Sequence, residues 1–153
     1  MDARFAEVIE SLHPKYEALM AMTPVTVETV PRDTPIGGVY LFSRDGEHLY
    51  AGRTKRRIRD RIWNHVDATA SDCPFAWRLA RAATGRLPTY RREGSQKHLL
   101  TDPCFKAAYD QAKLDIREMQ VRYVGEPDPL KQALLEIYVA VVTKAKHNDF
   151  GTH

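Results

Sequence analysis

Residues 38–52 read GVYLFSRDGEHLYAG, and this stretch predicts a β-hairpin at the centre of the fold. Runs of β-branched, aromatic and aliphatic residues, which favour strands, lie on both sides of Asp45-Gly46. An Asp-Gly pair between two such runs is a strong hairpin signal, because its residues tolerate the backbone of a tight turn.

The length of the turn decides where two tyrosines point. We expect a three-residue loop of residues 44–46, in which Ser43 faces Glu47 and Tyr40 faces Tyr50 across the hairpin. A two-residue loop of residues 45–46 would instead place the two phenols on opposite faces. The other interpretation is that both tyrosines only pack in the core.

A helix is predicted after the hairpin. Thr54 is a plausible N-cap, and Ile58, Ile62 and Val66 recur at every fourth position. Arg57, Arg61 and His65 repeat with the same spacing, so they form a row beside the apolar stripe. Arg61 is a candidate for binding phosphate, and His65 for orienting or deprotonating a tyrosine.

The start of this predicted helix is strongly basic, with six cations and one acid between residues 53 and 61. Such a run is usually a solvated helix face, but guanidinium groups also suit phosphate oxygens. The candidate nucleic-acid contacts are Arg53, Lys55, Arg56, Arg57 and Arg59.

A second helix, which carries a candidate carboxylate, is predicted near the end of the chain. Asp128 suits its N-cap and Pro129 its first position. The predicted apolar stripe is Leu130, Ala133, Leu134, Ile137, Tyr138 and Val141. Glu136 lies at the edge of that stripe beside small residues, which leaves room for a hydrated cation. Asn148 follows, either as a turn residue or as part of the site.

The ordered set of these residues resembles the GIY-YIG nucleases. The resemblance runs through Gly38-Val39-Tyr40, Tyr50-Ala51-Gly52, Arg61, His65, Glu136 and Asn148. Alanine replaces isoleucine in the second motif, and Arg61 lies one residue further from Tyr50 than in the compact repair-type members. The resemblance implies an α+β fold with a small, largely antiparallel sheet flanked by helices. Residues 36–153 would form the nuclease domain, with residues 1–35 as a helical and extended segment packed on it.

The expected function is that of a divalent-metal-dependent DNA endonuclease. Tyr40, or less favourably Tyr50, would take a proton from the attacking water, provided that its pKa is lowered or its hydroxyl is paired. Arg61 would stabilise the phosphate, and Glu136 would hold one Mg²⁺ or Mn²⁺. Asn148 would position the phosphate or a tyrosine. The residues expected to converge on one cleft are Tyr40, Tyr50, Arg61, His65 and Glu136.

Length and composition fit one soluble domain. The chain has 153 residues and a net charge of only +3, so its basicity is local. No run is apolar enough for a membrane span, no signal peptide is evident, and Cys73 and Cys104 lack metal-like spacing, so a cytoplasmic location is expected. Specificity could come from a homodimer, from a separate subunit, or from residues 86–103, which read as a substrate-facing loop. Three alternatives stay open: a non-catalytic nucleic-acid-binding module, a nuclease subunit active only with a partner, and a purely structural domain.

The rest of the chain completes the predicted order of elements. Helices are expected over residues 3–12, 75–83 and 105–118, an extended segment over 25–30, and a strand over 119–124.

Overall fold

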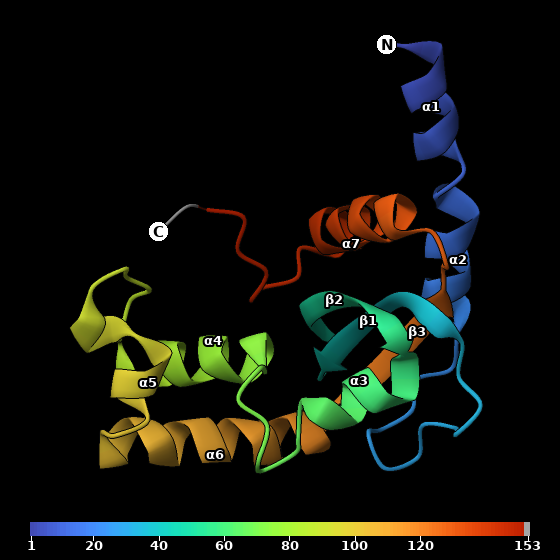
Figure 1. Cartoon of the computed structure of the whole chain (residues 1–153). Helices are drawn as coiled ribbons and strands as arrows, with labels where there is room; N and C mark the ends of the chain where they lie inside the picture. Colours follow the sequence, from blue (N-terminus) through green and yellow to red (C-terminus); the bar gives the residue numbers. More distant parts are fainter. Residues whose placement is uncertain (152–153) are drawn as a thin grey trace.

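Three antiparallel strands form the centre of the protein, in the order β2-β1-β3 (Figure 1). They are β1 (Ile36–Arg44), β2 (Glu47–Arg57) and β3 (Gln120–Gly125) in a computed structural model that describes residues 1–151. The helices are α1 (Ala3–Glu10), α2 (His13–Ala21), α3 (Ile58–Asn64), α4 (Pro74–Thr84), α5 (Gln96–Leu99), α6 (Pro103–Arg117) and α7 (Pro129–Thr143), with a short 3₁₀ turn η1 (Arg92–Gly94). The predicted α+β class with a small antiparallel sheet is therefore confirmed.

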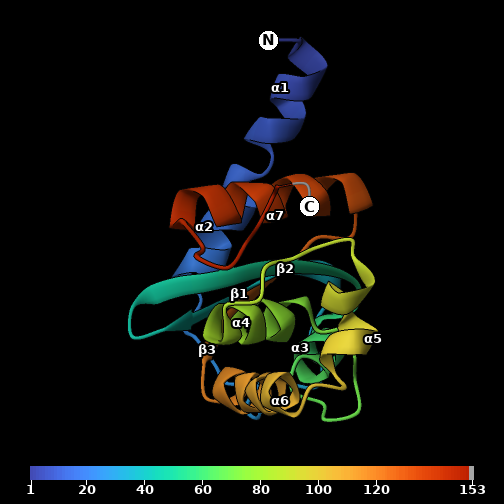
Figure 2. The ribbon, with the colours of Figure 1, turned by 90° about the vertical axis from the view of Figure 1, so that its left-hand side faces the viewer.

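Helices cover both faces of this sheet, as Figure 2 shows. Val39, Leu41 and Ala51 point to one face and pack with α2 and α7. Tyr40 and Tyr50 point to the other face, into the core shared with α3, α4 and α6. The alternation of side chains along β1 thus divides the protein into two apolar layers.

The hairpin turn differs from the expected three-residue loop. Arg44 pairs directly with Glu47, so only Asp45 and Gly46 form the turn, with φ values of 52° and 77°. Positive φ at both central residues is the geometry that Asp-Gly favours in two-residue hairpins. The prediction that Tyr40 pairs directly with Tyr50 was therefore wrong.

A β-bulge nevertheless returns Tyr50 to the face of Tyr40. Phe42 pairs with Tyr50 whereas the next residue, Ser43, pairs with His48, which leaves Leu49 as an extra residue on β2. One extra residue shifts the alternation of side chains by one position. Tyr40 and Tyr50 therefore share a face as diagonal neighbours despite the short turn.

The helix expected from Thr54 begins later. Strand β2 continues to Arg57, which pairs with Ile36 of β1, and the Thr54 hydroxyl accepts a hydrogen bond from the Arg56 amide at 3.0 Å. Ladder hydrogen bonds with β1 thus override the predicted cap. Helix α3 starts at Ile58, which is fully buried, as the four-residue spacing predicted.

Helix α7 begins as predicted but faces the sheet with another side. The Asp128 carboxylate accepts a hydrogen bond from the Lys131 amide at 2.8 Å, which confirms the N-cap. The buried residues are Gln132, Leu135, Val139 and Ala140, whereas Leu130, Ile137 and Val141 are exposed. The predicted stripe was wrong because this helix is apolar around most of its circumference, so periodicity does not define one face.

The remaining segments follow the prediction in part. Helices α4 and α6 match the expected helices to within a few residues, and Gly85 ends α4 with a left-handed backbone. Residues 86–103 contain η1 and α5 rather than loop alone, and residues 25–30 contribute only one bridge, between Val25 and Val121.

The N-terminal segment contacts the core unevenly. Leu12, Leu19, Val27 and Val30 are buried, whereas α1 has no buried residue and projects away from the body of the protein (Figure 1). Within residues 1–151, no helix combines the length and apolar character that crossing a membrane requires.

Candidate active site

Tyr40 and His65 form a buried hydrogen-bonded pair. The Tyr40 hydroxyl lies 2.8 Å from Nε2 of His65, and the two side chains are 1% and 0% exposed. Tyr40 lies in the middle of β1, and His65 is the C-cap residue directly after α3. Gly52 makes room for the phenol, because a Cβ at this position would lie 2.4 Å from the Tyr40 hydroxyl.

Burial keeps both members of the pair neutral. Desolvation raises the pKa of Tyr40, and the charge of Arg61 only partly offsets this effect. Desolvation and the nearby Arg61 cation lower the pKa of His65 to about 3. The expectation that the tyrosine is paired with His65 is thus met, while its pKa is raised rather than lowered.

Arg61 lies beside this pair and is held from its other side by a loop. Its Nη1 donates to the Asp72 backbone carbonyl at 3.1 Å and lies 3.4 Å from the Asp72 carboxylate. Asn64 holds the same carboxylate through a 2.8 Å hydrogen bond. The Arg61 side chain is only 14% exposed, so it is fixed close to the Tyr40 hydroxyl. Sequence reasoning missed Asp72, which has no periodic or motif signal.

Tyr50 packs within an aromatic and cationic environment. Its ring stacks on Phe75 at a centroid distance of 4.8 Å, and the Arg78 guanidinium lies 5.9 Å from its centroid. Burial raises the pKa of Tyr50, and Arg78 opposes that shift. No local sequence pattern links Arg78 to Tyr50, because their proximity arises from tertiary packing.

Glu136 reaches the site from the opposite side of the sheet. Helix α7 covers the face of the sheet opposite to the face from which the two tyrosine side chains project (Figure 2). However, β2 is an edge strand, and its cations meet α7: Arg53 Nε lies 3.0 Å from Glu136 Oε2, although 83 residues separate the two in the chain.

The Glu136 charge still reaches the tyrosines around this edge. It raises the pKa of both Tyr40 and Tyr50, and Arg78 acts on Glu136 from the tyrosine side. Burial raises the pKa of Glu136 itself, and the Arg53 ion pair opposes that rise. The arrangement therefore wraps around β2 rather than filling a single hollow.

Asn148 supports the backbone next to Tyr50. Its Oδ1 accepts from the Ala51 amide and its Nδ2 donates to the Ala51 carbonyl, both at 2.8 Å. It therefore binds strand β2 rather than capping its own turn, and it positions Tyr50 through the neighbouring peptide.

The predicted nucleic-acid contacts divide into paired and exposed residues. Arg53 is paired with Glu136, and Arg57 donates to the Thr34 carbonyl at 2.7 Å. Arg59 lies 5.6 Å from the centroid of the Trp63 ring. Lys55 and Arg56 are exposed on β2, and they are the members of this set best placed to meet a polyanion.

Two hollows flank these residues. One is lined by Arg53, Lys55, Arg56 and Arg61 with residues of α7. The other is lined by Arg78 and the segment that carries Asn148, with Arg81 of α4 and Arg86 just after that helix. Candidate site residues therefore line two separate basic hollows.

The carboxylate of Glu136 fits a cation that keeps most of its water. Within residues 1–151, no three histidine, cysteine or acidic side chains gather as a protein-only metal cage. Mg²⁺ usually binds through one or two carboxylates and retains several waters, so one half-buried glutamate is an adequate protein ligand. The raised pKa of Glu136 is also the shift that a nearby cation would reverse.

No protein-family model, curated protein or solved structure matches this chain.

Proposed function

We propose that this chain is a divalent-metal-dependent endonuclease that hydrolyses phosphodiester bonds in DNA, as its resemblance to GIY-YIG nucleases implies. The observation that carries the proposal is the Tyr40–His65 hydrogen bond with Arg61 beside it. A buried phenol, a neutral imidazole and a fixed guanidinium form a set that can move a proton next to a phosphate.

Each side chain has a role that follows from its position. Arg61 binds a phosphate oxygen of the substrate. This phosphate takes the place of the exposed Asp72 carboxylate as the anionic partner of Arg61. As Tyr40 accepts a proton from the attacking water, its own phenolic proton passes to Nε2 of His65 at 2.8 Å, so the phenol stays neutral and the imidazole takes up the charge. Asn148 keeps β2, and with it Tyr50, at the correct position.

Glu136 would hold Mg²⁺ or Mn²⁺, and the bound cation would supply positive charge for the leaving oxygen. For this, Arg53 must release the carboxylate that it binds at 3.0 Å. A phosphate that enters the hollow lined by Arg53 and Arg61 provides an alternative partner for that guanidinium.

Two observations favour a second function, a nucleic-acid-binding module without cleavage. The Tyr40 hydroxyl is enclosed, with the side chain 1% exposed, and Glu136 is already paired with Arg53. In that case the exposed cations would bind DNA while the tyrosine pair only stabilises the core.

Plasmid nicking separates the two functions. Supercoiled DNA is incubated with the protein and Mg²⁺, with a chelator, or with the Tyr40→Phe variant. The proposal expects nicking only for the wild-type protein with Mg²⁺. Equal DNA binding by wild type and variant, with no nicking by either, would support the binding module instead.

A further inference from the structure

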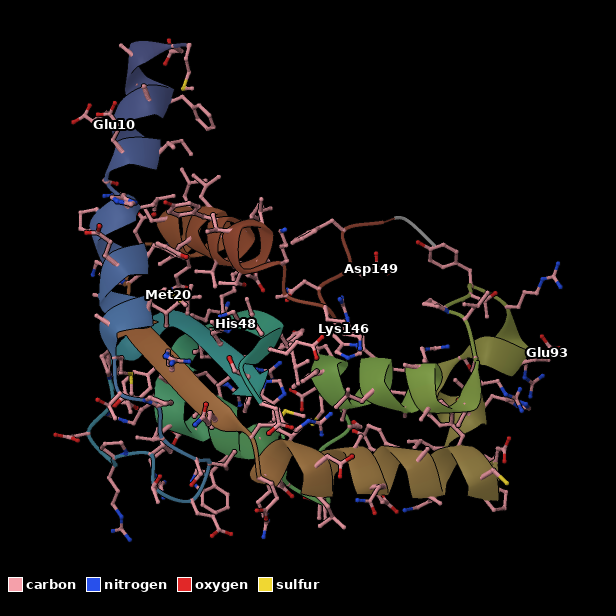
Figure 3. The ribbon with its side chains drawn as sticks, turned by 180° about the vertical axis from the view of Figure 1, so that it is seen from behind. Glu10, Met20, His48, Glu93, Lys146 and Asp149 are labelled. Atoms are coloured by element: carbon pink, nitrogen blue, oxygen red, sulfur yellow. The ribbon has the colours of Figure 1, made fainter. Side chains whose placement is uncertain are left out.

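The hollow next to Tyr50 combines cations from two distant parts of the chain. Figure 3 shows Lys146, from the segment after α7, beside α4, with Asp149 further along the same segment. The hollow has a volume of about 500 Å³. Its lining includes Arg78, Arg81, Arg86, Leu87, Lys146 and His147.

Two residues link this hollow to the candidate active site. Arg78 lines it and also lies over the Tyr50 ring, 5.9 Å from the centroid. Asn148 lines it and also brackets Ala51 of β2. A chain bound at the site would therefore enter this hollow directly on leaving Tyr50.

The loop beyond the hollow presents apolar side chains among cations. Leu87 is 82% exposed and Tyr90 is 89% exposed, and Arg91 and Arg92 beside them are exposed as well. Large apolar groups are costly to leave in water, so a pair of them in a basic loop indicates a contact surface.

This loop is anchored at both ends by one guanidinium. Arg81 donates through Nη1 to the Leu87 carbonyl and through Nη2 to the Gly94 carbonyl, both at 3.0 Å. Tyr90 lies between these two anchored carbonyls in the chain. Figure 3 shows Glu93 of this loop beyond the end of α4 that is remote from the sheet.

We propose that this hollow and loop form a second contact surface for the DNA substrate, with Tyr90 stacked on an unstacked base. The inference rests on the proposed function and adds to it: the hollow of Lys55 and Arg56 holds DNA on one side of the scissile phosphate, and this surface holds it on the other. Cations that follow the backbone together with an aromatic ring for the bases are the usual means of binding nucleic-acid strands.

The length of α4 sets the length of this contact with DNA. Helix α4 has 11 residues and so spans ~16 Å at 1.5 Å per residue, which is roughly five nucleotide steps of 3.4 Å. The charge of the surface argues for a polyanion, since four cations and one acid, Asp149, line the hollow. An acidic protein segment would also meet the charges but would offer no bases for Tyr90.

Fluorescence anisotropy with a labelled 30-base-pair duplex of mixed sequence tests this surface, in a chelator to prevent cleavage. Tyr90→Ala should weaken binding by about tenfold, the order expected for one lost base–aromatic stack. Lys146→Ala should weaken binding and reduce its salt dependence by about one counterion. The matched controls are Leu114→Ala and Lys106→Ala on the exposed face of α6, which should bind as the wild type does.

A second readout does not depend on affinity. The Tyr90→Trp variant should show quenched tryptophan emission on adding the duplex, beyond any change in the wild-type protein, whereas Leu114→Trp should not. Wild-type affinity in Tyr90→Ala together with unquenched Tyr90→Trp, in a protein that still nicks plasmid, would overturn this surface and leave the nuclease proposal intact. A wild-type protein that binds no duplex would overturn both. Tyr90-dependent binding of poly-glutamate but not of duplex would assign the surface to an acidic protein instead.

Discussion

The Tyr40 hydroxyl and His65 Nε2 lie 2.8 Å apart although 25 residues separate them in the chain. The contact depends on a strand that places Tyr40 on the α3 face and on a helix that ends at Asn64, one residue before His65. Nδ1 of His65 has no hydrogen-bond partner, so the Tyr40 hydroxyl is the one polar contact of this buried ring in the described structure of residues 1–151. This dependence makes the pair the first target for mutation.

Replacing Tyr40 by phenylalanine should abolish cleavage and lower stability. The variant loses the proton acceptor, which should reduce the single-turnover rate at least ~10²-fold. It also leaves both His65 nitrogens without a partner, which costs about 1–3 kcal/mol in the free energy of unfolding. Tyr123→Phe on the neighbouring strand is the matched control, and it should keep the wild-type rate. Cleavage by Tyr40→Phe at that same rate would rule out the phenol as the base.

His65 should make the protein less stable in mild acid. Its pKa is about 3 in the folded state against 6.5 in the unfolded chain, so protons bind the unfolded chain more readily. The stabilisation is present above pH 6.5 and is lost as the pH falls from 6.5 towards 3. Between pH 6.5 and 5 the loss approaches ~2 kcal/mol, since one pH unit corresponds to about 1.4 kcal/mol per proton.

Urea unfolding at several pH values checks this slope. His65→Gln should be less stable at neutral pH but should lack this part of the pH dependence. Burial also lowers the pKa of His48 and of His147, so their contributions persist in the variant and serve as an internal reference. Equal slopes in the two proteins would mean that His65 is protonated in the folded state.

Glu136→Gln should separate DNA binding from turnover. The substitution preserves shape and removes the charge that would hold Mg²⁺, so cleavage should fall at least ~10²-fold while duplex affinity stays close to wild type. Glu118→Gln, at an exposed position, is the control. Addition of a chelator to the wild-type protein should have the same effect as the Glu136 variant. Wild-type turnover by Glu136→Gln would refute the single-carboxylate site.

The cations on β2 should contribute to affinity, and Arg61 to the chemical step. Lys55 and Arg56 are exposed, so replacing both by alanine should weaken binding and flatten its salt dependence. Arg61→Ala should slow single-turnover cleavage even with saturating enzyme, because its charge acts on the phosphate in the transition state. Arg53 is left unchanged, since its ion pair with Glu136 would mix the two effects. Full rescue of Arg61→Ala by excess enzyme would reverse these assignments.

Local sequence signals predicted the elements of the fold better than their contacts. The Asp128 cap and the turn at Asp45-Gly46 were recognised, because each depends on the chemistry of one or two residues. The buried face of α7 was not, since leucine, isoleucine and valine occur on all sides of this helix and only its packing against β1, β2 and α2 selects Leu135 and Val139.

The candidate site shows the same limit. The four-residue spacing of Arg61 and His65 places them one helical turn apart at the end of α3. The hairpin brings Tyr40 and Tyr50 to one face of the sheet. The partners of Arg61 and Tyr50, namely Asp72 and Arg78, come from a loop and a helix that no local pattern links to them. The residues that set charge in the site are therefore visible only once tertiary packing is known.

Because of the bulge at Leu49, the face toward which Tyr50 points depends on the number of residues in the hairpin. Removing Leu49 alone, or adding one residue to the turn alone, would direct Tyr50 toward α7 or change the strand pairing around it. Making both changes together would return the phenol to its present face. Insertions and deletions in this hairpin are therefore tolerated in compensating pairs, and a designer who grafts another turn onto the protein must adjust the strand in the same step.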